Sequence, residues 1–134
     1  MAELTVTAAD VAPAKFIEQS TGPAGEAIVA GQLVHFGTAT GKYLLANGTG
    51  ATTVAGPLGI ALNGGTTNIT ISVLHKGLLD VGEALAALDY SDPVYAANTA
   101  GVLGDAAGSV STVVGRVVPG WGAITADKLL RIDL

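Results

Sequence analysis

The chain of 134 residues is long enough for one domain whose hydrophobic core needs no metal or disulfide staple. It has 11 acidic and six basic residues, and the basic residues are scattered singly without a stripe, which argues against a nucleic-acid partner. The absence of cysteine excludes disulfides, thiolate catalysis and zinc–sulfur sites, and it suits a reducing compartment.

No apolar run approaches the ~20 residues of a membrane span. The N-terminus also lacks a basic region followed by an apolar core. We therefore expect neither a membrane partner nor a secretory signal.

The composition predicts many short strands joined by tight turns, because the chain has 19 glycines and is rich in alanine, threonine and valine. Only 13% of its residues are charged, about half the usual share of a soluble domain. Such a neutral surface has two interpretations. It is either the ordinary surface of a small β protein, or a surface that is partly covered in an assembly.

Residues 1–24 are predicted to form an extended N-terminal arm, followed by a single β domain at residues 25–134. A frayed terminus, docking on the chain's own domain and docking on a partner are all open for this arm. Its apolar side chains need somewhere to be buried, and we assign them to partner binding. These side chains are Leu4, Val6, Val11, Phe16 and Ile17.

The most regular stretch is residues 56–81, which we interpret as the central hairpin of the domain. Apolar residues alternate with Thr70 and Ser72, which is the two-residue period of a strand. Before it, Asn-Gly-Gly at residues 63–65 supplies the positive φ angles of a hairpin connection. Gly77 interrupts the following segment, as a bulge or sharp bend does.

Residues 80–88 form the one predicted helix, at most two turns long. Asp80 and Glu83 have the spacing of a capping box, and Leu85 and Leu88 share one face. Packing under the barrel and an intersubunit contact are both open for that face, and we assign it to a subunit interface.

Trp121 stands alone in a Gly-Pro loop. It either caps the barrel or anchors an interface, where tryptophan is over-represented. We assign it to the same subunit interface.

A second cycle of the pattern begins after the predicted helix. Asp-Pro-Val-Tyr-Ala at residues 92–96 matches Gln-Leu-Val-His-Phe at residues 32–36 in position and pattern. The chain therefore looks like two related halves, residues 25–80 and 81–134, although chance similarity among glycine-rich strands competes with this interpretation. The fold class we predict is all-β, a small barrel or sandwich of short antiparallel strands with one short helix and the N-terminal arm.

No arrangement of side chains predicts a catalytic, metal or cofactor site. His35 and His75 are the only histidines, and neither has an acidic cluster near it in the sequence. Asp89 and Asp92 flank a turn, where aspartate is expected for local backbone bonding. A hydrolase that combined His75 with these two aspartates remains a minor alternative.

Several short motifs resemble the small capsid cement, or decoration, proteins of tailed bacteriophages. The run Gly-Glu-Ala-Ile-Val-Ala-Gly-Gln-Leu-Val at residues 25–34 looks like the opening strand of that family. Four further motifs follow in the family's order. They are Leu-Gly-Ile-Ala-Leu at 58–62, Lys-Gly at 76–77, Asp-Pro-Val-Tyr at 92–95 and Val-Gly-Arg-Val at 114–117.

This resemblance implies a β-rich structural protein, not an enzyme, that needs no cofactor. It would lie on the outer surface of a phage head, and in the host cytoplasm during assembly, as a homo-oligomer with a trimer favoured. Its partner would be the major capsid protein, whose subunits it bridges to stabilise the shell. The alternative is a carbohydrate- or receptor-binding module of a phage tail or fibre, with Trp121, Tyr90 and Tyr95 as a stacking face.

Overall fold

The computed structural model describes residues 3–50, 57–120 and 128–134. Over these residues the chain is an all-β antiparallel half-barrel with two 3₁₀ turns and no α-helix, which confirms the predicted fold class. Its turns are η1 (Ala8–Asp10) and η3 (Gly82–Leu85). Its strands are β1 (Val11–Pro23), β2 (Leu33–Gly37), β3 (Lys42–Leu45), β4 (Leu58–Ala61), β5 (Thr70–Val81), β6 (Pro93–Ala96), β7 (Leu103–Gly104), β8 (Val113–Pro119) and β9 (Lys128–Asp133).

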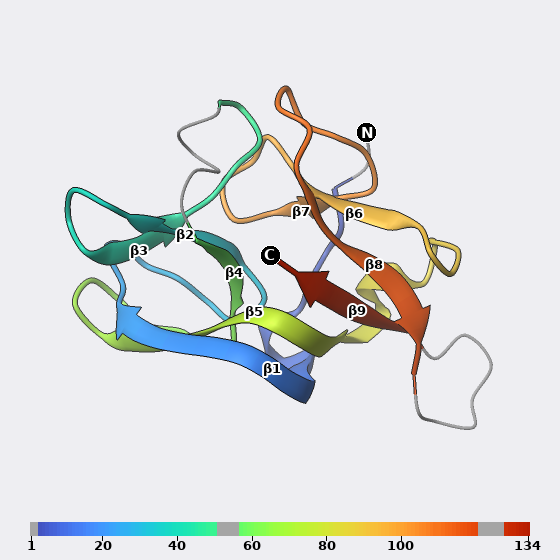
Figure 1. Ribbon diagram of the computed structural model, residues 1–134, viewed down its shortest axis with the longest axis horizontal. Helices are drawn as coiled ribbons and strands as arrows, with labels where there is room; N and C mark the ends of the chain where they lie inside the picture. Colours follow the sequence, from blue (N-terminus) through green and yellow to red (C-terminus); the bar gives the residue numbers. More distant parts are fainter. Residues whose placement is uncertain (1–2, 51–56, 121–127) are drawn as a thin grey trace.

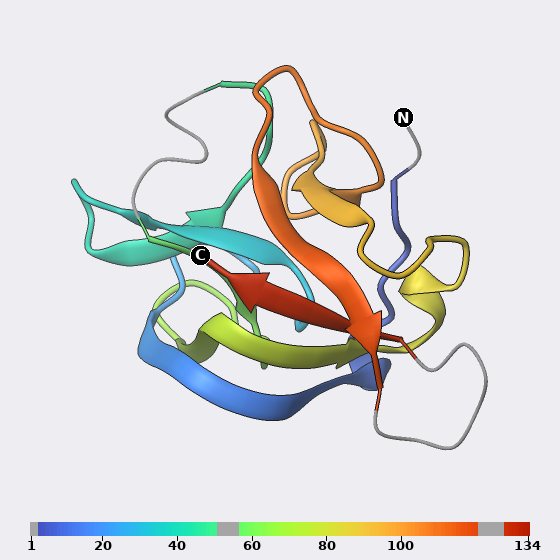
Figure 2. The ribbon, with the colours of Figure 1, turned by 45° about the vertical axis from the view of Figure 1, so that its right-hand side comes forward.

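Strand β5 joins the two parts of the sheet. One edge of β5 pairs with β1 along its length, from Thr70 opposite Pro23 to Val81 opposite Val11. Its other edge pairs first with β4 and then with β9, so the sheet order is β3-β2-β4-β5-β9-β8-β6-β7. Figures 1 and 2 show this sheet curling from β3 to β7, with β1 along its lower margin. The predicted central hairpin is the β4–β5 pair.

Gly77 changes the face that β5 presents to the core. Its φ of 145° is rare for residues with a side chain, and a Cβ there would lie 2.1 Å from the Lys15 carbonyl oxygen. Before Gly77, Ile71 packs in one hydrophobic cluster, whereas Leu79 after it packs in another. The register of β1 against β5 also shifts in this region. Because Leu74 before Gly77 and Leu79 after it both pack in the larger cluster, five positions apart, the predicted bend is where β5 reverses which of its alternating side chains face that cluster.

The two cores differ in size and in the strands that supply them. The smaller cluster lies between β5, the β2–β3–β4 part of the sheet and the residues that follow β1. Its buried members are Ala24, Ile28, Val34, Tyr43, Ala61, Ile71 and Val73. The larger cluster draws on strands from both ends of the chain. Its buried members are Leu33, Ala46, Leu58, Ile60, Leu74, Leu79, Val81, Leu85, Leu88, Val94, Ala96, Leu103, Val114, Val117, Leu130 and Ile132.

Strand pairings in the two parts of the chain correspond. Val34 of β2 lies opposite Gly59 of β4, and Val94 of β6 lies opposite Gly115 of β8. Each of these central strands has a hairpin partner on its other edge, β3 and β7 respectively. This matching geometry supports the hypothesis of two related halves.

The helix predicted at residues 80–88 is wrong in type. Strand β5 continues to Val81, and only η3 follows it. Asp80 does not cap a helix, because its Oδ1 accepts a hydrogen bond from the Gly82 N–H at 2.9 Å in a local turn. Gly82 has a φ of 65°, which turns the chain sharply before an α-helix can begin.

The predicted N-terminal arm is extended, but most of it belongs to the sheet. Residues 11–23 form β1, and Ala24 is fully buried in the smaller cluster. Nearer the terminus, Glu3 bridges to Gly104, and the Leu4 N–H donates to the Leu103 carbonyl at 2.8 Å. The chain therefore has no structural break at the boundary between residues 24 and 25.

We predict that Gly115→Ala destabilises the fold by about 1–3 kcal/mol, because a Cβ at Gly115 would lie 2.2 Å from the Arg131 carbonyl oxygen in a buried strand. The matched control is Gly50→Ala, where an added Cβ has no atom within 4 Å and the change should stay within about 0.5 kcal/mol. Urea unfolding measures both. Equal stability of the two variants would contradict the close approach of β8 and β9.

Candidate functional site

The exposed edge of β1 carries the two most exposed large hydrophobic side chains of the described residues. Phe16 is 54% exposed and Ile17 is 66% exposed. They are adjacent in sequence at a shift in the β1–β5 register. Within the described residues, β1 pairs only with β5, so its other edge has no strand partner. An apolar pair on an unpaired edge is a surface suited to a protein contact.

The same edge has features that limit uncontrolled strand addition. Pro13 has no N–H to donate, and the register shifts interrupt the regular ladder. Lys15 and Glu18 place exposed charges on either side of the apolar pair. Edge strands that carry proline, charges and bulges resist open-ended aggregation. These features leave a short segment around Phe16 and Ile17 as the exposed apolar part of the edge.

A chain of hydrogen bonds holds β1 to the body of the domain. His75 Nδ1 lies 2.6 Å from the Leu58 carbonyl oxygen, which can only accept, so we assign the proton to Nδ1. Nε2 then accepts from the Ser20 hydroxyl, 2.6 Å away. Ser20 Oγ is also bonded to the Tyr43 hydroxyl, which acts as its donor. The four residues link β1, β3, β4 and β5 into one network.

The polar side chains of this network are buried or partly buried, and all of them are hydrogen-bonded. His75 is 5% exposed, and no buried side-chain polar atom there lacks a partner. A serine bonded to a histidine is also the pair that performs acyl transfer. Here the Tyr43 hydroxyl donates to Ser20 Oγ and withdraws electron density from it, which opposes nucleophilic attack. The geometry is that of a clamp between strands.

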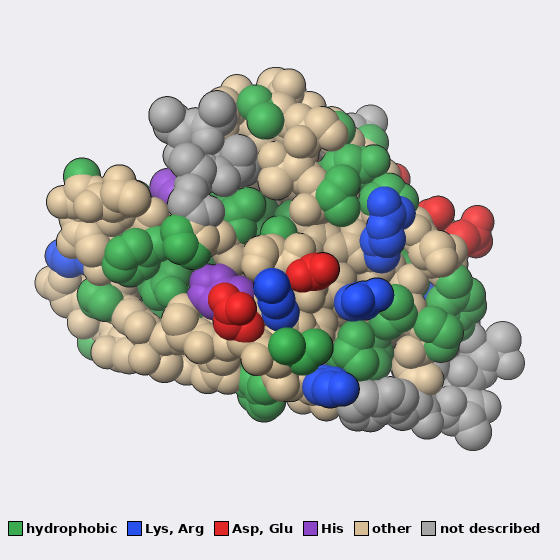
Figure 3. Space-filling view, in the orientation of Figure 1, with side chains coloured by type: hydrophobic (Ala, Val, Ile, Leu, Met, Phe, Trp, Pro, Cys, Tyr) green, Lys and Arg blue, Asp and Glu red, His purple; other side chains and the backbone are tan. Residues whose placement is uncertain are grey.

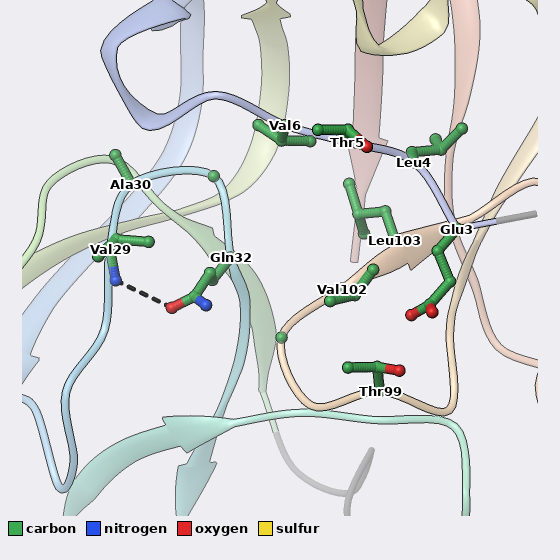
Figure 4. A pocket seen from close by; sticks show the side chains of 12 residues that line it. Glu3, Leu4, Thr5, Val6, Val29, Ala30, Gln32, Thr99, Val102 and Leu103 are labelled. Carbon is green, nitrogen blue, oxygen red and sulfur yellow. Dashed lines mark hydrogen bonds between the residues drawn. The ribbon is translucent and has the colours of Figure 1, made fainter.

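Three of the predicted arm residues face the chain's own domain. Leu4, Val6 and Val11 are half-buried and pack against the larger cluster. Leu4 and Val6 line a hollow of about 370 Å³ between the N-terminal segment and two loops, at residues 29–32 and 99–103 (Figure 4). Of the five residues assigned to partner binding, only Phe16 and Ile17 present most of their surface to solvent.

Leu85 and Leu88, which the sequence assigned to a subunit interface, are occupied within the chain's own core. Leu85 is fully buried and Leu88 is 8% exposed, and both belong to the larger cluster. Because η3 follows directly from β5, the shared face of these leucines turns inward over the curled sheet. Trp121, the third residue assigned to that interface, lies outside the described residues.

Residues considered for other functions are held in local contacts. The Asp92 carboxylate accepts from the Asp89 N–H at 2.9 Å, which makes a turn. Lys128 Nζ lies 5.4 Å from the centroid of the Tyr90 ring and covers one of its faces. His75 uses both ring nitrogens in the clamp, so neither is bonded to these aspartates.

Tyr95 lies on β6 and is half-buried, and His35 is half-buried on β2. Among the described residues there is no group of three or more side chains able to hold a metal ion. None of the described helical segments is long and apolar enough to cross a membrane.

Comparison with known protein families, with curated proteins and with solved structures finds no match for this chain.

We predict that Ser20→Ala destabilises the protein by about 1–3 kcal/mol, because it leaves the buried His75 Nε2 and the Tyr43 hydroxyl without their shared partner. Thr21→Ala, at the exposed next position, is the control and should change stability by less than about 0.5 kcal/mol. Chemical denaturation followed by circular dichroism compares the two. If Ser20→Ala were as stable as Thr21→Ala, the clamp would not hold β1 in place.

Proposed function

We propose that this protein is a capsid decoration, or cement, protein that binds the outer surface of a phage head and stabilises the shell by bridging major capsid subunits. The observation that carries the proposal is the exposed pair Phe16 and Ile17 on the unpaired edge of β1. The resemblance of several short motifs to those of the cement proteins is a separate support from the sequence.

The mechanism of stabilisation is bridging by many modest contacts. Burial of one large apolar side chain contributes roughly 1.5–3 kcal/mol, so the pair supplies a useful but limited affinity for each copy. In a symmetric cluster, for which a trimer is favoured, the copies act at high effective concentration and their contacts reinforce one another. Separating two capsid subunits would then require several such contacts to be lost together.

Rigidity of the β1 edge also favours this role. A bridge resists separation only if its contact surface is fixed relative to its own body. Ser20 lies on β1 three residues after Ile17, and the clamp fastens it to β3 and β5. A partner that binds the edge would therefore pull on the whole sheet instead of on a loose arm.

We predict that the double substitution Phe16→Ser and Ile17→Thr weakens binding to shells at least tenfold, since both apolar side chains leave the contact. Expanded heads that lack this protein are incubated with each variant, and the bound fraction is measured by sedimentation. Point changes are preferable to removal of residues 1–23, because that removal would strip β5 of its partner strand.

The matched control is Ile69→Thr, which removes a 52% exposed apolar side chain from the loop before β5. Its binding should equal that of the unaltered protein. Undiminished binding of the double variant would remove the β1 edge from the contact. Failure of the unaltered protein to bind any shell would overturn the proposed function itself.

A further inference from the structure

The outer face of the sheet carries a row of cations that is hidden in the sequence. Arg116 of β8 lies directly opposite Arg131 of β9, and Arg131 lies opposite Leu78 of β5. Leu78 in turn lies opposite Lys15 of β1. Residues directly opposite each other in a sheet share a face, so these four side chains form one line across four strands. We call Lys15, Arg131 and Arg116 the cationic row.

The adjacent row carries one cation and two carboxylates, so its formal charge is −1. Lys76 of β5 has a carboxylate opposite it on either side, Glu18 of β1 and Asp133 of β9. Its Nζ lies 3.8 Å from Asp133 Oδ1. The cationic row has no carboxylate among its directly opposed positions. Figure 3 shows basic and acidic side chains side by side on this face, with basic groups on either side of an acidic one.

Arg116 and Arg131 are both exposed, and like charges directly opposite each other destabilise a sheet. Arg116 is steadied by one hydrogen bond from its guanidinium to the Ser91 carbonyl oxygen at 3.1 Å. Both arginines and Asp133 line a hollow of about 430 Å³ over β8 and β9. Together they place guanidinium donors beside a space that another side chain can enter.

The composition of the whole chain makes this grouping significant. The protein has only six basic residues and a net charge of −5, yet three of the six stand in this line. The row also begins at Lys15, which directly precedes Phe16 and Ile17 on β1. Arginine beside exposed apolar residues is typical of protein interfaces.

We infer that the cationic row binds carboxylate groups of an acidic patch on the outer surface of the shell. This inference rests on the proposed function and adds the chemistry of the partner to it. Guanidinium groups bind carboxylates in a bidentate manner, and such a partner would also relieve the repulsion between Arg116 and Arg131. Three cations on an acidic protein are few for a nucleic-acid backbone, whose binding needs many phosphate contacts.

The test compares Arg131→Gln with Lys42→Gln, which removes the same charge from β3, outside the row. Binding to heads that lack this protein is measured at low and high salt. We expect Arg131→Gln to weaken binding about fivefold at low salt and to match the unaltered protein at about 0.5 M NaCl, where exposed pairs are screened. Lys42→Gln should bind as the unaltered protein does. Thermal unfolding checks that both variants are folded.

The outcomes separate this inference from the proposed function. If the unaltered protein binds shells and Arg131→Gln binds equally well at low salt, the cationic row is not part of the contact, while the proposed function stands. If no shell is bound at any salt concentration, the proposed function fails first. Retention on duplex DNA, or head-to-tail self-association lost in Arg131→Gln, would overturn the acidic shell partner.

Discussion

The pairing of β1 with β5 is the constraint on which the rest of this structure depends. Strand β5 contributes to both hydrophobic cores, and β1 covers its free edge from Val11 to Pro23. A residue without a side chain is required at Gly77, where the strand reverses which of its alternating side chains face the larger core. Because β1 also carries the exposed apolar pair, the element that completes the fold also supplies the contact surface that we propose.

The fold class could be predicted because its signals are local. Alternation around Thr70 predicts strand β5 from adjacent residues alone. The positive φ angles expected at residues 63–65 are wrong, because in this connection the positive φ lies at Asn68. The helix was predicted wrongly because a capping-box spacing does not reveal that β5 continues through Asp80 to Val81. The pairing with β1 holds β5 as a strand up to Val81, which leaves the helix-favouring alanines and leucines after it too short a segment for the predicted helix.

The candidate surface was harder to predict because it depends on register between distant strands. Lys15, Arg116 and Arg131 look scattered in the sequence, and only the pairings of β1, β5, β9 and β8 align them. The clamp was missed for the same reason, since 55 residues separate Ser20 from His75. The sequence shows that the N-terminal segment is apolar. It does not show which of these side chains face the core and which face solvent, because that depends on how the segment packs against the rest of the chain.

The length of the β1–β5 ladder has a mechanical consequence. A force directed along the strands loads all of its hydrogen bonds in shear, so they must break together. A force directed across them opens the ladder one bond at a time from an end. The molecule is therefore stiff toward sliding of β1 along β5 and compliant toward peeling of one strand from the other.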